Sequence, residues 1–212
     1  MIDLTQLHKA VLTGDAKAAK TVTEQALAEG HDPLQLVQTQ MMPAMAEVGR
    51  RFECNEYFVP ELLLSARAMK AALELLRPLL AAKGTEPVGR VALGTVKGDL
   101  HDIGKNLVSM MLEGAGFKVL DLGVDLSVEK LVDQVKSVGP DVLGLSALLT
   151  TTMPEMQKVI AELKNQGLRD KVKVLVGGAP VDRAFAEKIG ADGYGSNAAE
   201  AVELARRFAG AK

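Results

Sequence analysis

The chain has 212 residues, 48% of them hydrophobic, and its 25 basic residues nearly balance its 27 acidic residues. This composition predicts a globular protein with an ample core, and it excludes the strongly basic surface that nucleic acids and anionic membranes select. We therefore expect no nucleic-acid partner and no membrane partner. The single cysteine, Cys54, and the lack of a basic segment followed by an apolar run predict a reducing, cytoplasmic setting.

The first 83 residues have a helical pattern throughout. Leu4, Leu7 and Val11 repeat with the spacing of one apolar helix face, which predicts a first helix that ends before Gly14. Asp32 followed by Pro33 is typical of a capped helix start. We expect a bundle of four helices. After the first helix, the others cover residues 15–29, residues from 33 through Val48, and residues 62–76, with a turn at 55–60.

The pattern changes near Gly84, Pro87 and Gly89, where β-branched runs begin. Short apolar runs then alternate with helical segments, which predicts a doubly wound, flavodoxin-like α/β domain with a parallel sheet. The expected division is a helical domain at 1–83, a linker at 84–90 and the α/β domain at 91–212. We expect strands at 91–96, 118–122, 141–145, 172–176 and 192–194, and helices at 102–114, 128–137, 154–166, 181–189 and 198–208.

A polar loop, Gly98 to Gly104, follows the first predicted strand and carries His101 between Asp99 and Asp102. A loop histidine is most often solvated or structural, but Asp99 could accept a proton from one ring nitrogen while the other faces a metal. Alternatively, Asp99 caps the next helix, a role that Asp102 fills equally well. One imidazole cannot hold a bare ion, and no other histidine or cysteine lies nearby in sequence. A macrocycle is therefore the economical source of the remaining metal ligands.

Small residues end the later strands. Ser146-Ala147-Leu148 follows the third strand and Gly177-Gly178 follows the fourth. Such residues form ordinary turns, or they mark a place where a ligand or another backbone comes close. Together with the histidine loop, they describe a narrow slot at one edge of the sheet. Thr150 to Thr152, with Pro154, predicts the start of the next helix and could offer hydroxyls to this slot.

Three motifs carry a resemblance to a known family. Asp99-x-His101-x-x-Gly104, Ser146-x-Leu148 and Gly177-Gly178 resemble the signature of proteins that bind cobalamin with its own base displaced and a histidine in its place. The first half resembles the helical cap of cobalamin-dependent methyltransferases, including methionine synthase, at residues 48–52, 57–60 and 65–70. The resemblance covers nearly the whole chain, which is similar to the stand-alone corrinoid proteins of methylamine, betaine and methoxyaromatic demethylation systems.

This resemblance implies a role for each matching residue. His101 would be the lower axial ligand of cobalt, and Asp99 and Ser146 would form a proton relay behind it. Phe52 and Val59 would cover the methyl face of the cofactor, although both also fit a helix core. The residues implied to bind the cofactor, cobalamin or a related corrinoid, are Gly49, Phe52, Val59, Gly98, Asp99, His101, Asp102, Ile103, Gly104, Ser146, Leu148, Thr150, Gly177, Gly178, Tyr194, Asn197 and Ala198.

The function implied is that of a methyl carrier in one-carbon metabolism that is not catalytic alone. It would cycle between Co(I) and methyl-Co(III), taking a methyl group from a substrate-specific methyltransferase and giving it to an acceptor methyltransferase specific for tetrahydrofolate or a thiol. A reductive activase is the third expected partner. We expect no barrel for either substrate, since the two modules account for the 212 residues. The alternative is a cobalamin-dependent sensor, although no basic recognition helix is visible, and the methyl donor stays open.

Overall fold

The computed structural model describes residues 2–82 and 87–210. It divides into two compact units, Met1–Pro87 with Glu113–Gly116, and Val88–Leu112 with Phe117–Lys212. Residues 83–86, which include the first part of the predicted linker, lie outside the described residues. The predicted domain boundaries therefore stay a prediction, and each unit is described by itself.

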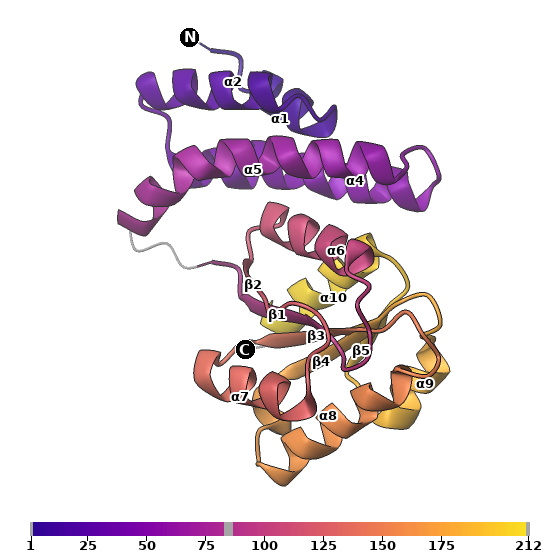
Figure 1. The fold of residues 1–212 in the computed structure, drawn as a ribbon. Coiled ribbons are helices and arrows are strands. Elements are labelled where there is room, and N and C mark those ends of the chain that lie inside the picture. Colours follow the sequence, from indigo (N-terminus) through magenta and orange to yellow (C-terminus); the bar gives the residue numbers. More distant parts are fainter. Residues whose placement is uncertain (1, 83–86, 211–212) are drawn as a thin grey trace. The chain divides into compact units, whose positions relative to one another are not determined.

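The first unit is built from helices, as predicted (Figure 1). Asp15 and Asp32 cap two of them, because their carboxylates accept backbone N–H groups of Ala18 and of Leu34 and Gln35. Apolar side chains from the facing sides of the helices, among them Leu7, Met41, Leu62 and Met69, are buried. The helices are α1 (Thr5–Leu12), α2 (Ala16–Ala28), α3 (Pro33–Leu36), α4 (Met42–Glu53) and α5 (Val59–Ala82), with a π-helical turn, η1 (Val37–Met41), between α3 and α4.

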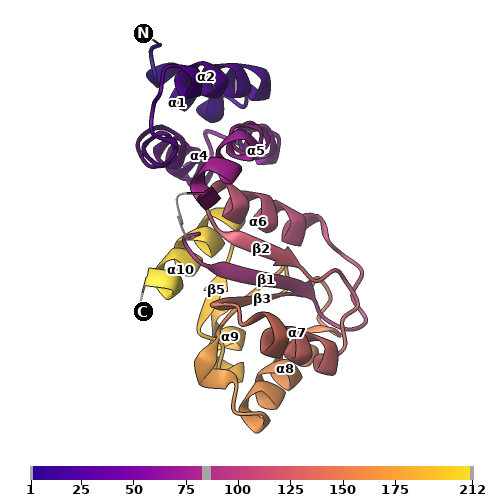
Figure 2. The ribbon, with the colours of Figure 1, turned by 90° about the vertical axis from the view of Figure 1, so that its left-hand side faces the viewer.

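The second unit is a five-stranded parallel sheet with the order β2-β1-β3-β4-β5. Helices α6 and α10 cover one face, and α7, α8 and α9 cover the other (Figures 1 and 2). The strands are β1 (Arg90–Thr95), β2 (Lys118–Asp121), β3 (Val142–Ser146), β4 (Lys173–Gly177) and β5 (Gly193–Gly195). The helices are α6 (Ile103–Gly114), α7 (Val128–Val138), α8 (Met153–Asn165), α9 (Arg183–Ile189) and α10 (Ala198–Gly210), with a 3-10 turn, η2 (Arg169–Lys171), before β4.

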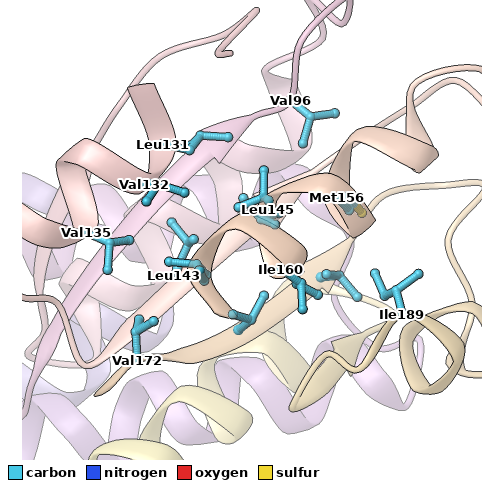
Figure 3. Packing of buried hydrophobic residues seen from close by; sticks show 14 of the residues in the cluster. Val96, Leu131, Val132, Val135, Leu143, Leu145, Met156, Ile160, Val172 and Ile189 are labelled. Carbon is cyan, nitrogen blue, oxygen red and sulfur yellow. The ribbon is translucent and has the colours of Figure 1, made fainter. Parts of the chain in front are cut away.

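This is the predicted flavodoxin-like arrangement, and within this unit the ends of the predicted strands and helices differ from the observed ends by no more than two residues. The helical unit differs more: its third predicted helix is divided into α3, η1 and α4, and its last helix begins at Val59, inside the predicted turn at 55–60. The core under the central strands is apolar. Leu143 and Leu145 of β3 pack with Val132 and Val135 of α7 and with Ile160 of α8 (Figure 3). Burying each such side chain stabilises the fold by about 1.5–3 kcal/mol. The strand ends that carry the site are therefore rigidly supported.

The order of the strands places a topological switch point between β1 and β3. The chain leaves β1 toward β2 on one side, whereas β3 pairs with the other side of β1. Loops that follow strands on either side of such a point diverge and leave a crevice, which is where open α/β sheets bind ligands. The last residues of the strands form one row across the sheet, because Thr95 is in register with Ser146, Ser146 with Gly177, and Gly177 with Gly195.

Candidate functional site

His101 lies in the loop between β1 and α6, and three hydrogen bonds hold it. Its Nδ1 is 2.7 Å from Oδ1 of Asp99, and its backbone N–H donates to the same oxygen at 3.0 Å. The hydroxyl of the buried Thr95 donates to the His101 carbonyl at 3.1 Å. The imidazole is 52% exposed, and no described residue forms a hydrogen bond with its Nε2. Because the carboxylate accepts at Nδ1, the lone pair of Nε2 is directed away from Asp99 and is free for a metal.

Asp99 is fully buried, and its second oxygen belongs to the loop after β3. Oδ2 accepts the backbone N–H groups of Leu148 at 2.7 Å and Leu149 at 3.3 Å, and the hydroxyl of Thr152 at 2.9 Å. Burial alone raises the pKa of Asp99, but the hydrogen bonds from the Leu148 and His101 backbones, from the His101 ring and from Thr152 outweigh burial and hold the pKa below its usual range. A negative charge therefore stands behind the imidazole at neutral pH.

The hydroxyl that reaches Asp99 is that of Thr152, which the sequence did not single out for this role. The relay of Asp99 and Ser146 stays a prediction, and in the described part of the chain these two side chains form no hydrogen bond with each other. Ser146 still belongs to β3, where its carbonyl accepts the N–H of Val96 at 3.1 Å. Asp99 instead lies against the loop beyond the strand. Thr152 precedes α8, yet its hydroxyl caps no N–H of that helix, and its one proton is shared between Asp99 and the Leu149 carbonyl.

The start of α6 is anchored by a polar network that the sequence also left unassigned. The Asp102 carbonyl accepts the N–H of Asn106 at 2.7 Å, and its carboxylate accepts the side-chain amide of Asn106 at 3.0 Å. Asp102 thus precedes the first turn of the helix, as predicted, but its carboxylate accepts a hydrogen bond from a side chain and not from a backbone N–H. The buried Lys105 ammonium donates to Asn106 at 2.9 Å and to both oxygens of Asp121 at 2.5 and 2.6 Å. This network holds the first turn of α6 to the end of β2.

The surroundings of His101 are apolar and open. Leu100 is 72% exposed and Ile103 is 83% exposed, and Leu148 and Leu149 in the neighbouring loop are also exposed. Gly104, in the first turn of α6, has no atom within 4 Å of the position that a Cβ would take. Glycine in a helix costs about 1 kcal/mol relative to alanine, and no packing here requires it. Open space at a glycine, beside exposed apolar side chains and a free imidazole nitrogen, fits a large, mainly apolar ligand that comes close to the backbone.

A bare metal ion does not fit this edge. Among the described residues, no three His, Cys, Asp or Glu side chains are grouped so that they could hold an ion. A macrocycle that supplies its own nitrogen ligands needs only one imidazole from the protein. The residues around His101 therefore fit a corrinoid.

The two glycines after β4 are explained by the protein backbone itself. At Gly178, where φ is +127°, a Cβ would lie 1.8 Å from the carbonyl oxygen of Ala147. At Gly177 it would lie 3.1 Å from the carbonyl oxygen of Gly195. Of the alternatives that the sequence left open, close approach of another backbone is the one found. The glycines let the loop after β4 support the loop that carries the donors to Asp99, while the slot itself stays a prediction.

The remaining predicted residues are divided between the units. In the α/β unit, Thr150 lies exposed in the loop after β3, Tyr194 lies in β5, and Asn197 precedes α10, where its side-chain oxygen accepts the N–H of Glu200 at 2.9 Å. Ala198 begins α10. In the helical unit, Gly49 is buried and Phe52 half-buried on α4, and Val59 at the start of α5 is 41% exposed. Their contacts with the cofactor stay predictions.

The fold and the site together define a cobalamin-binding type of α/β domain that accompanies a helical domain. Family models described as B12 binding domains match residues 89–203 and residues 4–77. The chain belongs to the family of corrinoid proteins with B12-binding domains, and its cofactor is cobalamin or a related corrinoid.

Its relatives match along nearly their whole length. A corrinoid protein of Desulfitobacterium hafniense is 42% identical over 210 residues, which cover 98% of this chain and 97% of that protein. Dimethylamine corrinoid protein 1 of Methanosarcina acetivorans is 44% identical over 206 residues, which cover 97% of this chain and 96% of that protein.

Solved structures give the same result. A cobalamin-binding protein from Desulfitobacterium hafniense is similar with a TM-score of 0.84 at 36% identity, over 98% of this chain and 99% of that chain. A chain in the methanol:cobalamin methyltransferase complex from Methanosarcina barkeri is similar with a TM-score of 0.86 at 30% identity, over 99% of this chain and 80% of that chain. No helix in the described residues has both the length and the apolar character needed to cross a membrane.

Proposed function

We propose that this protein is a methyl carrier in which His101 is the lower axial ligand of the corrinoid cobalt, in place of the cofactor's own base. One observation carries the proposal. The half-exposed imidazole is fixed through Nδ1 to the buried, ionised Asp99, and its Nε2 has no hydrogen bond to a described residue. A carboxylate that orients a histidine in this way also raises the basicity of the nitrogen that faces the metal.

The bound cofactor supplies a cobalt centre that accepts and gives up a methyl group. The chain supplies control of a proton. A lone pair on Nε2 can bind a metal or a proton but not both, so attachment of His101 is coupled to release of a proton from Nε2. Thr152, whose hydroxyl lies 2.9 Å from Asp99 and 2.8 Å from the Leu149 carbonyl, can donate its one proton to either group.

The partners proposed are a substrate-specific methyltransferase that loads the methyl group, an acceptor methyltransferase that removes it, and a reductive activase. Support comes from relatives named for trimethylamine and dimethylamine, and from the similar chain in a methanol:cobalamin methyltransferase complex. Phe52 and Val59 of the helical unit are proposed to shield the methyl face. A cytoplasmic setting is part of the proposal and rests on the single cysteine, Cys54.

The test is the variant His101→Ala, with His31→Ala in the helical unit as its matched control. Both proteins are reconstituted with cobalamin, freed of unbound cofactor by gel filtration, and compared by visible spectrum and by cobalamin retained per chain. We expect His101→Ala to keep its fold by circular dichroism, to lose the spectrum of histidine-ligated cobalamin, and to retain cobalamin about tenfold less tightly. His31→Ala should match the wild type.

Methyl transfer from a panel of amine, betaine and methoxyaromatic methyltransferases to the reconstituted protein then identifies the donor. Full retention of cobalamin by His101→Ala, with an unchanged spectrum, would show that His101 is not the ligand.

A further inference from the structure

The loop between β2 and α7 passes beside the turn that precedes His101. In this loop, Asp125 makes two hydrogen bonds in opposite directions to adjacent residues of that turn. Its carboxylate Oδ1 accepts the N–H of Gly98 at 2.7 Å, and its own N–H donates to the carbonyl of Asp99 at 3.0 Å. Asp125 therefore clamps the Gly98–Asp99 turn from a segment that lies 27 positions away from Gly98 in sequence.

Asp125 has an unusual backbone conformation, with a positive φ. Its φ is +51°, in the left-handed region, which is unfavourable for a non-glycine residue. Aspartate tolerates this region better than most residues do, because its short side chain bonds locally. Here the two hydrogen bonds offset the unfavourable φ, because this conformation directs both the N–H and the carboxylate of Asp125 toward the same turn. On the other side of the clamp, Gly98 is also left-handed, with a φ of +81°.

The clamp continues the pairing of the sheet. Beyond the end of β2, the N–H of Leu126 donates to the carbonyl of Thr95 at 3.1 Å, and Val96 forms an isolated parallel bridge with Leu126. This pairing brings Asp125 to Gly98 as the chain leaves β1. The hydrogen bond and bridge of Leu126, the next residue, therefore fix the position of Asp125 relative to β1.

The position of the turn matters because Asp99 is the centre of the site. Its carboxylate accepts bonds of 2.7 to 3.3 Å from His101, Leu148, Leu149 and Thr152. Hydrogen bonds weaken steeply with small errors in distance and angle, so a shift of the Asp99 backbone by about 1 Å would disturb several of them together. Apart from Asp125, the described backbone bond at Asp99 runs from its N–H to the carbonyl of Val96, at 3.2 Å.

We propose that Asp125 is a positioning residue for the cofactor site: it clamps the Gly98–Asp99 turn so that Asp99 presents the His101 ring in the orientation for ligation. This inference rests on the proposed role of His101. Asp125 acts through Gly98 and Asp99 and not by contact with the cofactor. A merely structural role would affect the free energy of unfolding but would leave the orientation of His101 unchanged.

Three substitutions separate the parts of the clamp. Asp125→Asn keeps a side-chain oxygen for Gly98 and tolerates a positive φ. Asp125→Gly accommodates the positive φ without strain but removes the acceptor. Asp125→Ala removes the acceptor and strains the backbone. All three variants keep the backbone N–H that donates to Asp99. The comparison of Asp125→Gly with Asp125→Asn therefore isolates the bond that the Gly98 N–H donates to the side chain at position 125.

The variants are compared both without cofactor and after reconstitution with cobalamin. In the cofactor-free protein, NMR gives the amide exchange rate of Gly98 and the ring ¹⁵N shifts of His101, which report its tautomer. After reconstitution with cobalamin, the visible spectrum gives the fraction of histidine-ligated cofactor. We expect Asp125→Asn to resemble the wild type. In Asp125→Gly, the Gly98 amide should exchange about tenfold faster, the His101 ring shifts should change, and the histidine-ligated fraction should fall.

Two outcomes overturn the inference. Unchanged exchange at Gly98 in Asp125→Gly would mean that the clamp does not hold the turn. Faster exchange at Gly98 with unchanged ring shifts and an unchanged histidine-ligated fraction would leave Asp125 a purely structural role. If instead the wild type takes up cobalamin without histidine ligation, the proposed function of His101 fails, and the Gly98 and His101 shifts of the cofactor-free protein still decide whether Asp125 positions the ring.

Discussion

At the scale of single residues, Asp99 joins the two loops at the switch point. It lies after β1, it orients His101, and it accepts three donors from the loop after β3. A buried carboxylate is stable only when its oxygens are satisfied, so each donor contributes to the fold as well as to the site. The hydroxyl of Thr152 is the one side-chain donor among these three, and it can be changed by a single substitution.

We predict that Thr152→Val lowers the free energy of unfolding by about 1–2 kcal/mol, because Asp99 loses a donor while the volume of the side chain is kept. Thr152→Ser, which restores the hydroxyl, should recover most of this loss. Urea denaturation of the cofactor-free protein followed by circular dichroism measures both. Thr150→Val, two positions earlier and exposed, is the control and should be near neutral. Equal stability of Thr152→Val and the wild type would refute the bond to Asp99.

At the scale of elements, the turn between α4 and α5 is held by a charged network. Glu47 accepts hydrogen bonds from Arg50 and Arg51, at 2.7 to 2.8 Å. Arg51 also donates to the hydroxyl of Tyr57 at 3.1 Å and lies 5.1 Å from the centre of its ring. The Tyr57 hydroxyl in turn donates to the Leu12 carbonyl at the end of α1, at 3.3 Å. The network ties the turn that leads to Val59 to the rest of the helical unit.

This network predicts a pH dependence of stability. The hydrogen bonds from Arg50 and then Arg51 lower the pKa of Glu47 from 4.5 to about 2 in the folded protein. Because the folded pKa lies below the unfolded one, the stabilisation is fully present above pH 4.5 and is lost as the pH falls toward 2. We expect Glu47→Gln to melt at a lower temperature than the wild type at neutral pH, with the difference shrinking across this acid range.

Thermal denaturation at a series of pH values measures this difference. The matched control is Glu74→Gln, which changes an exposed carboxyl group on α5. Its difference from the wild type should be small at every pH. A difference for Glu47→Gln that stays constant as the pH falls would contradict the assigned role of Glu47.

At the scale of the whole molecule, the protein is proposed to supply one imidazole, that of His101, to a cofactor that already contains its metal. The described residues hold no cluster of ligands for a free ion, whereas His101 and the exposed apolar residues beside it fit a corrinoid. Free cobalt and cobalamin should therefore have different effects on the same protein.

We predict that cobalamin raises the unfolding temperature and that cobalt(II) chloride does not. A ligand that binds only the folded state stabilises it by about 2.7 kcal/mol at one hundred times its Kd. Differential scanning calorimetry of the cofactor-free protein with each additive measures the shift, and His101→Ala should show a smaller shift with cobalamin. A stabilisation by cobalt(II) alone that equals the effect of cobalamin would indicate a protein-built metal site and would contradict this prediction.

Most of the helices and strands, and the pairing of Asp99 with His101, could be predicted from the sequence. Apolar spacing is a local property, so it predicts the helices and the parallel strands, and residues two positions apart in a loop are near each other in any conformation. Which of Ser146 and Thr152 bonds to Asp99 does not follow from the local sequence. Their distances from Asp99 depend on where β3 ends and how the following loop turns, and this loop brings the hydroxyl of Thr152, 53 positions away in sequence, to Asp99.

The same reason applies to Asp125 and Gly178. Asp125 reaches Gly98 because the segment after β2 continues to pair with β1, and Gly178 must be glycine because the Ala147 carbonyl lies against it. Both contacts join the ends of neighbouring strands that are far apart in sequence. The order of strands in the sheet, which places β1 between β2 and β3, decides such contacts, and periodicity along the chain carries no information about which strands become neighbours.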